Sequence, residues 1–449
     1  MKQVVFFIAG IITLHVGLSS CNNNNPQSSV ADRTESASQK DSSAGLQTGD
    51  SLPAPFATKS VTNNSKVIGW KDGRVPTAPA GFLVTRFADS LDHPRWIYVA
   101  NNGDIFIAES NTVLKGAKKI GAKLSRKIST QHQGESADRI TMFRDADKNG
   151  SYESRFVFAE DLNQPLGMLI LKDHFYIANT DGLRIYPYKN GMTALNGTGK
   201  QIVNLPAGGY NNHWTRNIVA NAAGTKIYIS VGSGSNVGEH GMDNEVRRAG
   251  ILEINPDGSG EKVYASGLRN PVGLAWAPGT GVLWAAVNER DELGDDLVPD
   301  YMTSVKEGGF YGWPYSYFGS HPDPRMKDDP HPELVSKAIV PDVPLGPHTA
   351  SLGLAFYEGQ AFPSRYRNGA FVGQHGSWNR SALNGYKVVF VPFNSGKAGQ
   401  PEDFLTGFIV DADKSEVAGR PVGVAVTKQG DLLVADDVSN IIWKVSSKK

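Results

Sequence analysis

The chain has 449 residues and carries 45 Lys or Arg against 45 Asp or Glu, so its formal net charge is zero. This balance leaves no electrostatic footprint for nucleic acid, and we expect no nucleic-acid partner. The single cysteine excludes an internal disulfide, and no glycine-rich nucleotide fingerprint points to NAD or FAD.

Residues 1–20 have the pattern of a secretory leader. Lys2 gives a positive start, residues 4–16 form an apolar stretch too short to span a bilayer comfortably, and small residues lead to Cys21. This ending resembles the lipobox of bacterial lipoproteins, in which the cysteine is acylated. We therefore expect a lipoprotein signal peptide, lipidation at Cys21, and a place in the cell envelope on the outer membrane, facing the periplasm or the surface. An ordinary signal peptide with a chance cysteine is the alternative.

Residues 21–65 are rich in Ser, Asn, Thr and Ala and have few large apolar side chains. Such a segment buries too little surface to offset the entropy of ordering it. We expect a flexible tether here, and a single domain over residues 66–449. No later apolar run is long enough for a spanning helix, so the lipid would be the only membrane attachment.

The domain contains a repeat. A corner that often reads Pro-x-Gly leads into an apolar strand, a turn and a second apolar strand, which is an all-β pattern. Six copies occur, over residues 93–108, 164–178, 213–230, 270–285, 351–372 and 420–435.

Six copies of about 62 residues each predict an all-β, six-bladed β-propeller, since a stacked solenoid usually has shorter repeats. The ring would close by pairing residues 82–85 with residues 441–445, which hides the sheet edges. The residues that precede the innermost strands would then converge on one mouth of the channel, and convergent polar groups in a pocket are the default site. These residues are Arg95, Gln164, His213, Arg269, Asn270 and Arg420.

Residues 143–150 begin like an EF-hand loop, but the twelfth position is Phe156, which cannot supply the bidentate carboxylate. A full EF-hand is rejected. A partial structural calcium loop and a plain hairpin turn rich in Asp and Asn both remain open.

Three stretches together, residues 211–217, 267–275 and 309–314, resemble the glucose/sorbosone dehydrogenase family over essentially the whole domain. The resemblance implies a ring that holds pyrroloquinoline quinone and Ca²⁺ at its top and oxidises an aldose or a sorbosone-like sugar. A quinone or a cytochrome outside the cytoplasm would be the electron acceptor.

The resemblance makes His213 the general base, which removes the sugar hydroxyl proton while a hydride passes to the quinone. Imidazole suits this role because its ordinary pKa is near neutrality. Arg269 would hold the cofactor and stabilise the oxyanion on the reduced quinone, since guanidinium groups pair well with carboxylates. Asn212 and Arg216 are nearby candidates for orienting the base.

The cofactor-binding residues expected from the resemblance are Gln164, Arg216, Arg269, Asn270, Arg380 and Arg420. Arg380 departs from the glucose enzymes, which have a lysine near the quinone. Trp214 and Trp378 are candidates either for stacking on a flat ligand or for the core.

For calcium, residues 288–296 correspond to a family loop that offers backbone oxygens to the metal, although the Gly-Pro of the glucose enzymes is missing. Five acidic side chains in this loop favour a hard cation. We expect backbone ligation at Arg290 and Asp291, with Asp295 and Asp296 bracing the loop. A charged, solvated loop is the alternative.

Two other functions compete with the dehydrogenase. One is a calcium-dependent propeller lactonase or related hydrolase, which gives no reason for several arginines at the mouth. The other is a non-catalytic carbohydrate-binding propeller at the cell surface. Fold alone does not choose among them, because propellers carry many activities.

Overall fold

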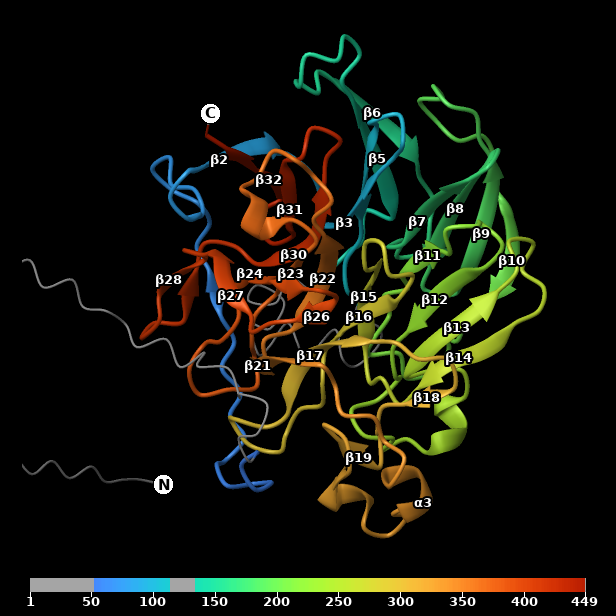
Figure 1. Cartoon of the computed structure of the whole chain (residues 1–449), viewed down its shortest axis with the longest axis vertical. Coiled ribbons are helices and arrows are strands. Elements are labelled where there is room, and N and C mark those ends of the chain that lie inside the picture. Colours follow the sequence, from blue (N-terminus) through green and yellow to red (C-terminus); the bar gives the residue numbers. More distant parts are fainter. Residues whose placement is uncertain (1–51, 114–133, 449) are drawn as a thin grey trace, which may run out of the picture. The chain divides into compact units, whose positions relative to one another are not determined.

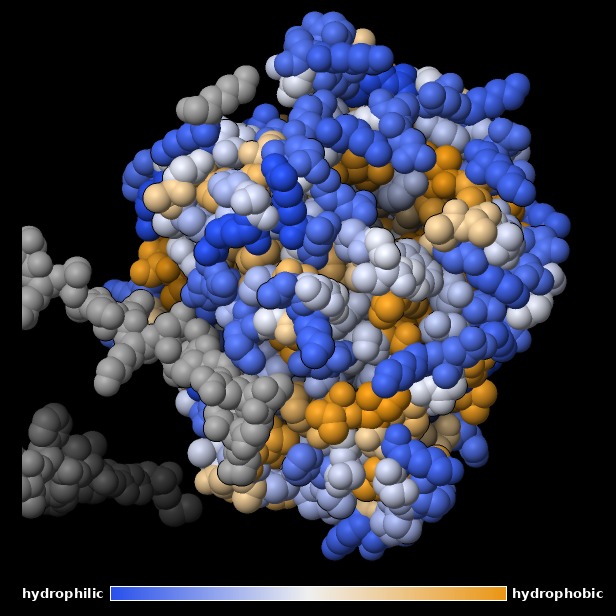
Figure 2. Space-filling view, in the orientation of Figure 1, coloured by the Kyte–Doolittle hydropathy of each residue, from blue (hydrophilic) through white to orange (hydrophobic). Residues whose placement is uncertain are grey.

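The computed structural model describes residues 52–113 and 134–448. The predicted signal peptide, Cys21 and most of the predicted tether lie outside these residues. Within them, no helix is both long enough and apolar enough to cross a membrane. Hydrophilic side chains cover most of the face shown in Figure 2, and hydrophobic ones form scattered patches.

Six antiparallel sheets form the blades of a propeller, as predicted. Each blade has four strands, and a further short strand, β18 (Gly309–Phe310), pairs parallel with the outer strand of the third blade. In Figure 1 the inner strands β3, β15, β22 and β30 lie around the middle of the ring, and β6, β10 and β27 lie at its rim. Blade 1 is β3 (Pro94–Val99), β4 (Ile105–Glu109), β5 (Arg139–Arg144) and β6 (Ser154–Ala159); blade 2 is β7 (Met168–Leu171), β8 (His174–Asn179), β9 (Gly182–Pro187) and β10 (Lys200–Asn204); blade 3 is β11 (Ile218–Ala220), β12 (Ile227–Val231), β13 (Gly250–Ile254) and β14 (Lys262–Ser266). Blade 4 is β15 (Pro271–Trp276), β16 (Leu283–Val287), β17 (Pro299–Ser304) and β21 (Val343–Pro347); blade 5 is β22 (Ser351–Phe356), β23 (Ala370–Gln374), β24 (Lys387–Val391) and β27 (Glu402–Leu405); blade 6 is β30 (Pro421–Val426), β31 (Leu432–Asp436), β32 (Ile441–Ser447) and β2 (Phe82–Ala88).

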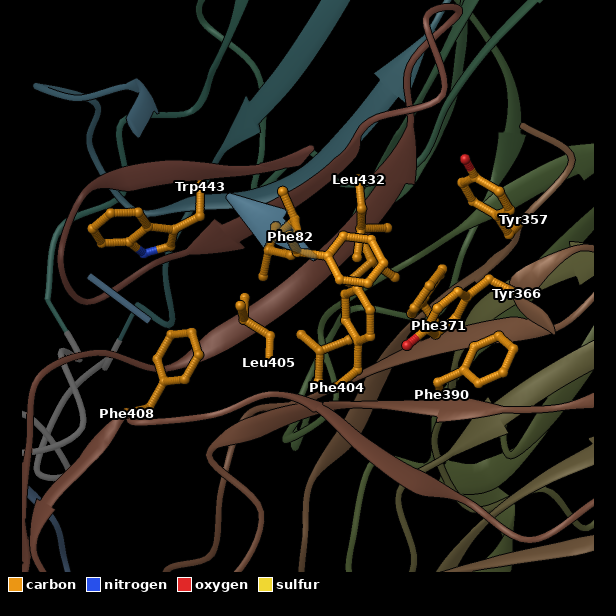
Figure 3. Close-up of a cluster of buried hydrophobic side chains, with 14 of the residues drawn as sticks. Phe82, Tyr357, Tyr366, Phe371, Phe390, Phe404, Leu405, Phe408, Leu432 and Trp443 are labelled. Carbon is orange, nitrogen blue, oxygen red and sulfur yellow. The ribbon is translucent and has the colours of Figure 1, made fainter. Parts of the chain in front are cut away.

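The ring closes where the sequence predicts. Strand β2 comes from the start of the domain and pairs antiparallel with β32 from its end, with Phe82 opposite Ser447 and Thr85 opposite Lys444. Beside this seam, the ring centroid of Phe82 lies 5.2 Å from that of Phe404, edge to face (Figure 3). The ring centroid of Phe82 also lies 4.7 Å from that of Phe362 in the same geometry. Aromatic contacts of this geometry add about 0.5–1.5 kcal/mol each beyond area burial. Blades 5 and 6 are thus joined by an aromatic cluster next to the closing strands.

The glycine of the repeated corner has a packing role at the centre of the ring. A Cβ on Gly167 would lie 2.7 Å from the backbone nitrogen of Ile218, and a Cβ on Gly423 would lie 2.6 Å from the carbonyl oxygen of Arg95. Real Cβ atoms do not come so close, so only glycine allows each inner strand to approach the next one. Gly273 and Gly353 meet the following inner strand in the same way.

The antiparallel pairing within each blade determines which residues lie at the mouth of the channel. In each blade the inner strand starts at the same edge at which the second strand ends, for example Pro421 opposite Asp436 in blade 6. Residues before every inner strand therefore lie beside residues that follow every second strand. The sequence prediction used only the first of these two sets.

The predicted tether extends too far along the chain. Within residues 52–65, the Phe56 N–H donates to the Leu293 carbonyl at 2.8 Å, and the Asn63 N–H donates to the Trp378 carbonyl at 2.8 Å. Next in the chain, β1 (Lys66–Val67) pairs with β29 (Glu416–Val417). These backbone groups find partners in the ring, so a segment poor in apolar side chains is ordered by hydrogen bonds. Residues 52–65 belong to the domain.

Candidate active site

His213 precedes β11 and is partly buried at the mouth. Its Nδ1 lies 2.7 Å from the Ser233 carbonyl oxygen and 3.0 Å from Ser233 Oγ. A carbonyl oxygen only accepts, so Nδ1 carries the proton and Nε2 keeps its lone pair. No described residue makes a hydrogen bond with Nε2.

A buried chain of polar groups holds this tautomer. The Ser233 hydroxyl donates to the Ser235 carbonyl at 2.6 Å, so its oxygen can only accept from His213. Glu245, at the end of the short helix η1 (Met242–Glu245), accepts the Ser235 hydroxyl and, at 2.7 Å, the Gly234 N–H. The carboxylate thus fixes the turn that presents Ser233 to the ring of His213.

The electrostatic setting keeps the ring of His213 uncharged. Burial, and after it the positive charge of Arg269, lowers the pKa of His213 to about 3. A neutral imidazole with a free Nε2 is the form that a general base requires at neutral pH.

Asn270 lies close to His213. A Cβ on Gly232 would overlap both the Asn270 side-chain oxygen and the Cβ of His213. Both side chains therefore pack against the same glycine. The Asn270 Oδ1 is buried and has no hydrogen-bond partner among the described residues. A buried polar atom without a partner is costly, which marks this position as one that awaits a ligand or water.

The side chain of Arg269 is fully engaged with the protein itself. Its Nη1 donates to the Glu289 carbonyl at 2.6 Å and also reaches Asn288, and its Nη2 donates to Asn236 Oδ1 at 2.9 Å and Asp291 Oδ2 at 3.1 Å. Its Nε donates to the Asn236 carbonyl at 3.3 Å. All five N–H donors of the guanidinium group are accounted for, so Arg269 positions the loop beside His213.

Arg216 does not face the mouth, contrary to the prediction. It is fully buried, and its terminal nitrogens donate to the carbonyls of His213, Thr215 and Pro206 and to Asn211 Oδ1. Its terminal nitrogens are used within the loop that carries His213, while its buried Nε has no partner among the described residues. Arg216 therefore orients that loop from behind, which is the alternative role considered for it.

A second cluster at the mouth joins blades 1, 5 and 6 and was missed by the sequence prediction, except for Arg95 and Arg420. Asp437 follows β31, accepts Arg95 Nη1 at 2.6 Å and contacts His375 Nε2 at 2.9 Å. Burial opposes its ionisation, but the facing His375 ring and the Arg95 guanidinium hold the pKa of Asp437 well below its usual value. Arg420 donates to the carbonyls of His375 and Gly376, both at 2.9 Å. The buried Nε of Arg95 has no partner within the described part of the chain.

The other predicted cofactor residues also contact the protein itself. Gln164 donates from Nε2 to the Asn111 carbonyl at 2.8 Å. Arg380 pairs with Asp296 at 3.0 Å, and its buried Nε lacks a partner among the residues described. Trp214 is buried beneath Arg95, whose guanidinium carbon lies 5.4 Å from the ring centre, so it has a core role. Trp378 is partly buried.

In the acidic loop 288–296, donors of the protein itself occupy one of the two backbone oxygens predicted to bind calcium. The Asp291 carbonyl oxygen already accepts Arg325 Nη1 at 2.8 Å and Asn236 Nδ2 at 3.1 Å. Arg290 is fully buried and contacts Glu289 and Asp323. Hydrogen-bond donors thus occupy the Asp291 carbonyl, one of the two predicted ligands, while ligation by the Arg290 carbonyl stays a prediction.

Asp295 and Asp296 do brace this loop, against the loop 376–384 of blade 5. Asp295 accepts the Ser381 N–H at 3.1 Å and also contacts its hydroxyl, and Asp296 pairs with Arg380. A cavity of about 470 Å³ opens beside the acidic loop. It is lined by Asn236, Val237, Gly238, Glu239, Glu292, Arg325 and Met326.

The loop between β5 and β6 has a different character. Ligand oxygens of Asp145, Asp147 and Glu153 lie within 4.8 Å of one another. Asn149 and Gly150 donate their N–H groups to Asp145 at 3.0 and 2.8 Å, which is the geometry of a hairpin turn stabilised by aspartate. Both interpretations of this loop stay open.

The protein is thus a six-bladed propeller whose mouth combines a neutral histidine, several arginines and a buried amide oxygen that has no partner among the described residues. The chain belongs to the TrAA12-like family, a pyrroloquinoline quinone-dependent sugar dehydrogenase family, whose model matches residues 76–307 and 318–448. The resemblance noted in the sequence is confirmed at this level.

Three proteins illustrate the similarity. An uncharacterized protein of Borreliella burgdorferi is 29% identical over 386 residues, which cover 83% of this chain and 90% of that protein. The AA12 enzyme of Trichoderma reesei, solved as an iodide structure and a calcium structure, has TM-scores of 0.65 and 0.64, with 18% and 17% identity over 86% of this chain and 100% and 99% of that chain. The holo form of the pyranose dehydrogenase PQQ domain of Coprinopsis cinerea has a TM-score of 0.63, with 19% identity over 86% of this chain and all of that domain. At these identities the solved structures show the fold alone.

Proposed function

We propose that this protein oxidises a sugar, an aldose or a sorbosone-like compound, with pyrroloquinoline quinone, and that His213 is the general base. The observation that carries the proposal is the ring of His213, which is neutral, held in one tautomer by Ser233, and free at Nε2. In the sugar complex, Nε2 would accept the proton of the hydroxyl whose carbon loses a hydride. General-base catalysis of this kind is worth about 10²–10⁴ in rate.

The residues at the mouth fit the cofactor in charge and in hydrogen bonding. Pyrroloquinoline quinone is a planar tricarboxylate, and guanidinium groups suit carboxylates. Arg95 and Asn270 each have a buried polar atom that lacks a partner in the described chain, and Arg380 has another. Arg95, Arg420 and Asn270 would hold the cofactor, with Arg380 and Gln164 farther out. When bound, the quinone supplies the hydride acceptor.

Among this chain's own residues, Arg269 has an indirect part. Its guanidinium fixes the loop 288–291 and lies near His213, where its charge disfavours protonation of the ring. It thereby keeps the base available. A direct contact from Arg269 to the cofactor, as the resemblance suggested, would require one of its existing hydrogen bonds to break.

The test begins with cofactor binding. Purified protein is titrated with pyrroloquinoline quinone, followed by its absorbance, and then assayed with aldoses and sorbosone and an artificial electron acceptor. The matched variant is His213→Asn, which should bind the cofactor like the wild type and lose most turnover. If the wild type binds no quinone, the dehydrogenase proposal is wrong, and lactone hydrolysis and sugar binding should be measured instead.

We propose further that the protein is held at the outer membrane by a lipid on Cys21 and passes electrons to a quinone or a cytochrome of the envelope. The support is the run from Leu18 to Cys21. Cys21→Ala should move the protein from the membrane fraction to the soluble fraction. A variant that still partitions with membranes would mean that the anchor is elsewhere.

A further inference from the structure

We infer that Arg325 takes the place of a divalent cation at the acidic loop 288–296, so that this loop needs no calcium. The residue lies in the short helix η2 (Pro324–Met326), outside the four-stranded blades. A related fold has been solved as a calcium structure, and the sequence itself predicts calcium at this loop. The contacts of the loop instead favour an arginine in place of the cation.

Hydrogen bonds from all three nitrogens fix the guanidinium group of Arg325. Asp323 accepts its Nε at 2.9 Å and its Nη2 at 2.8 Å, a bidentate pair. The remaining nitrogen, Nη1, points to the Asp291 carbonyl oxygen at 2.8 Å. A bidentate arginine has little freedom, so its charge is held against the backbone oxygen that the metal would have used.

Two further oxygen-bearing groups beside the Asp291 carbonyl also have donors. The Glu289 carbonyl accepts Arg269 at 2.6 Å. The carboxylate of Asp291 faces Arg269 Nη2 at 3.1 Å through one oxygen and His348 Nδ1 at 3.4 Å through the other. Calcium requires six to eight oxygen ligands. Here the carbonyl and carboxylate oxygens of Asp291 already have donors, while Glu289 Oε1 is buried and has no partner among the described residues.

The ion pairs nearest the Asp291 carbonyl are balanced without a metal. Three carboxylates, those of Glu289, Asp291 and Asp323, face three guanidinium groups. Arg290 pairs with Glu289 and Asp323, and Arg325 pairs with Asp323. Adding a divalent cation at Asp291 would place two further positive charges beside these three arginines.

The first measurement is thermal unfolding and calcium calorimetry of a protein in which Asp145→Asn and Asp147→Asn remove the convergent carboxylates of the β5–β6 loop. That background separates the two acidic loops. We expect the same melting temperature in chelator and in millimolar Ca²⁺, and no binding heat. A melting temperature that falls in chelator and recovers with Ca²⁺ would overturn the inference.

The second measurement removes the arginine in the same background. Arg325→Met removes the bidentate partner of Asp323 and one of the two donors to the Asp291 carbonyl, so the variant should melt at a lower temperature in chelator and gain stability from added Ca²⁺. Arg325→Lys keeps a positive charge and should show a smaller calcium response, and it serves if the methionine variant does not fold. A folded variant whose stability is indifferent to Ca²⁺ would remove Arg325 from this role.

The inference also predicts that quinone binding needs no calcium, and this part rests on the proposed function. Different results would contradict the inference and the proposed function. Pyrroloquinoline quinone should bind to the wild type equally well in chelator and in Ca²⁺. If no quinone binds in either condition while the melting results hold, the proposed function fails and the role of Arg325 stands. If quinone binds only with Ca²⁺, the inference fails and the dehydrogenase remains.

Discussion

His213 and His375 lie at the same mouth, and the comparison between them shows how a fold makes one histidine reactive and another structural. Both rings are uncharged at neutral pH: burial and a nearby arginine lower the pKa of His213 to about 3 and that of His375 to about 4. Their partners differ. Nδ1 of His213 faces a backbone carbonyl, whereas Nε2 of His375 faces the carboxylate of Asp437.

The pKa alone does not distinguish the two residues, but the location of the proton does. In His213 the proton sits on Nδ1 and the outer nitrogen is free. In His375 the proton sits on Nε2, between the ring and a buried acid that also holds Arg95. The first arrangement leaves a base for a ligand, and the second ties two blades together.

The largest effect should come from replacing the two rings in turn. His213→Asn removes the base and should lower turnover by about 10²–10⁴, with quinone binding retained. His375→Asn keeps a side chain that donates to Asp437 and should lower turnover far less. Turnover at saturating cofactor, measured on both variants, tests this contrast. Equal losses would mean that His213 is not the base.

Next in size is the effect of Asp437→Asn on stability. Removing this charge leaves Arg95 buried without its carboxylate, and breaking a buried pair in this way costs about 3–5 kcal/mol. The matched control is Glu402→Gln, which breaks the exposed pair with Arg365 and should cost less than about 1 kcal/mol. Urea unfolding gives both values. Similar costs for the two variants would show that the Asp437 cluster does not hold the blades together.

A smaller effect is expected from Glu245→Gln, behind His213. The amide keeps the shape but presents an NH₂ where a carboxylate oxygen accepts an N–H or a hydroxyl, so the turn at Ser233 should loosen at a cost of roughly 1 kcal/mol. Nitrogen NMR of the ring should then show a mixture of tautomers, and turnover should fall several-fold while the sugar KM changes little. An unchanged tautomer would remove Glu245 from the positioning of the base.

The smallest effect concerns acid. Because the pKa of both rings is lower in the folded protein than the ordinary 6.5, the unfolded chain binds protons first as the pH falls. As the pH falls from about 6.5 to the pKa values of the folded protein, about 3 for His213 and about 4 for His375, these two residues therefore lower the free energy of unfolding. His375→Asn should make the loss of stability at acid pH smaller.

The same low pKa of His213 has a kinetic consequence. In the wild type, kcat/KM should not fall through protonation of the base until the pH is below about 4. A fall centred near pH 6.5 would contradict the lowered pKa.

The sequence by itself determined the ring. The repeated corner, the alternation of turns and apolar strands and the pairing of residues 82–85 with 441–445 follow from local patterns that any strand must satisfy. The glycines of the repeat were visible as well, and the structure gives their reason in the approach of neighbouring inner strands. His213 and Asn270 were found because they precede inner strands.

Only the tertiary structure decided what those residues face. Ser233, Glu289, His375 and Asp437 follow the second strands of their blades, and antiparallel pairing brings them to the same edge; a search of those positions would have found them. The acidic loop 288–296 shows the limit most clearly. Its composition favoured a metal, but the arginines that neutralise it include Arg269, from before β15, and Arg325, from a helix outside the blades. Counting charges along a segment cannot reveal partners that are close only in space, and those partners decide whether an acid binds a cation or a guanidinium group.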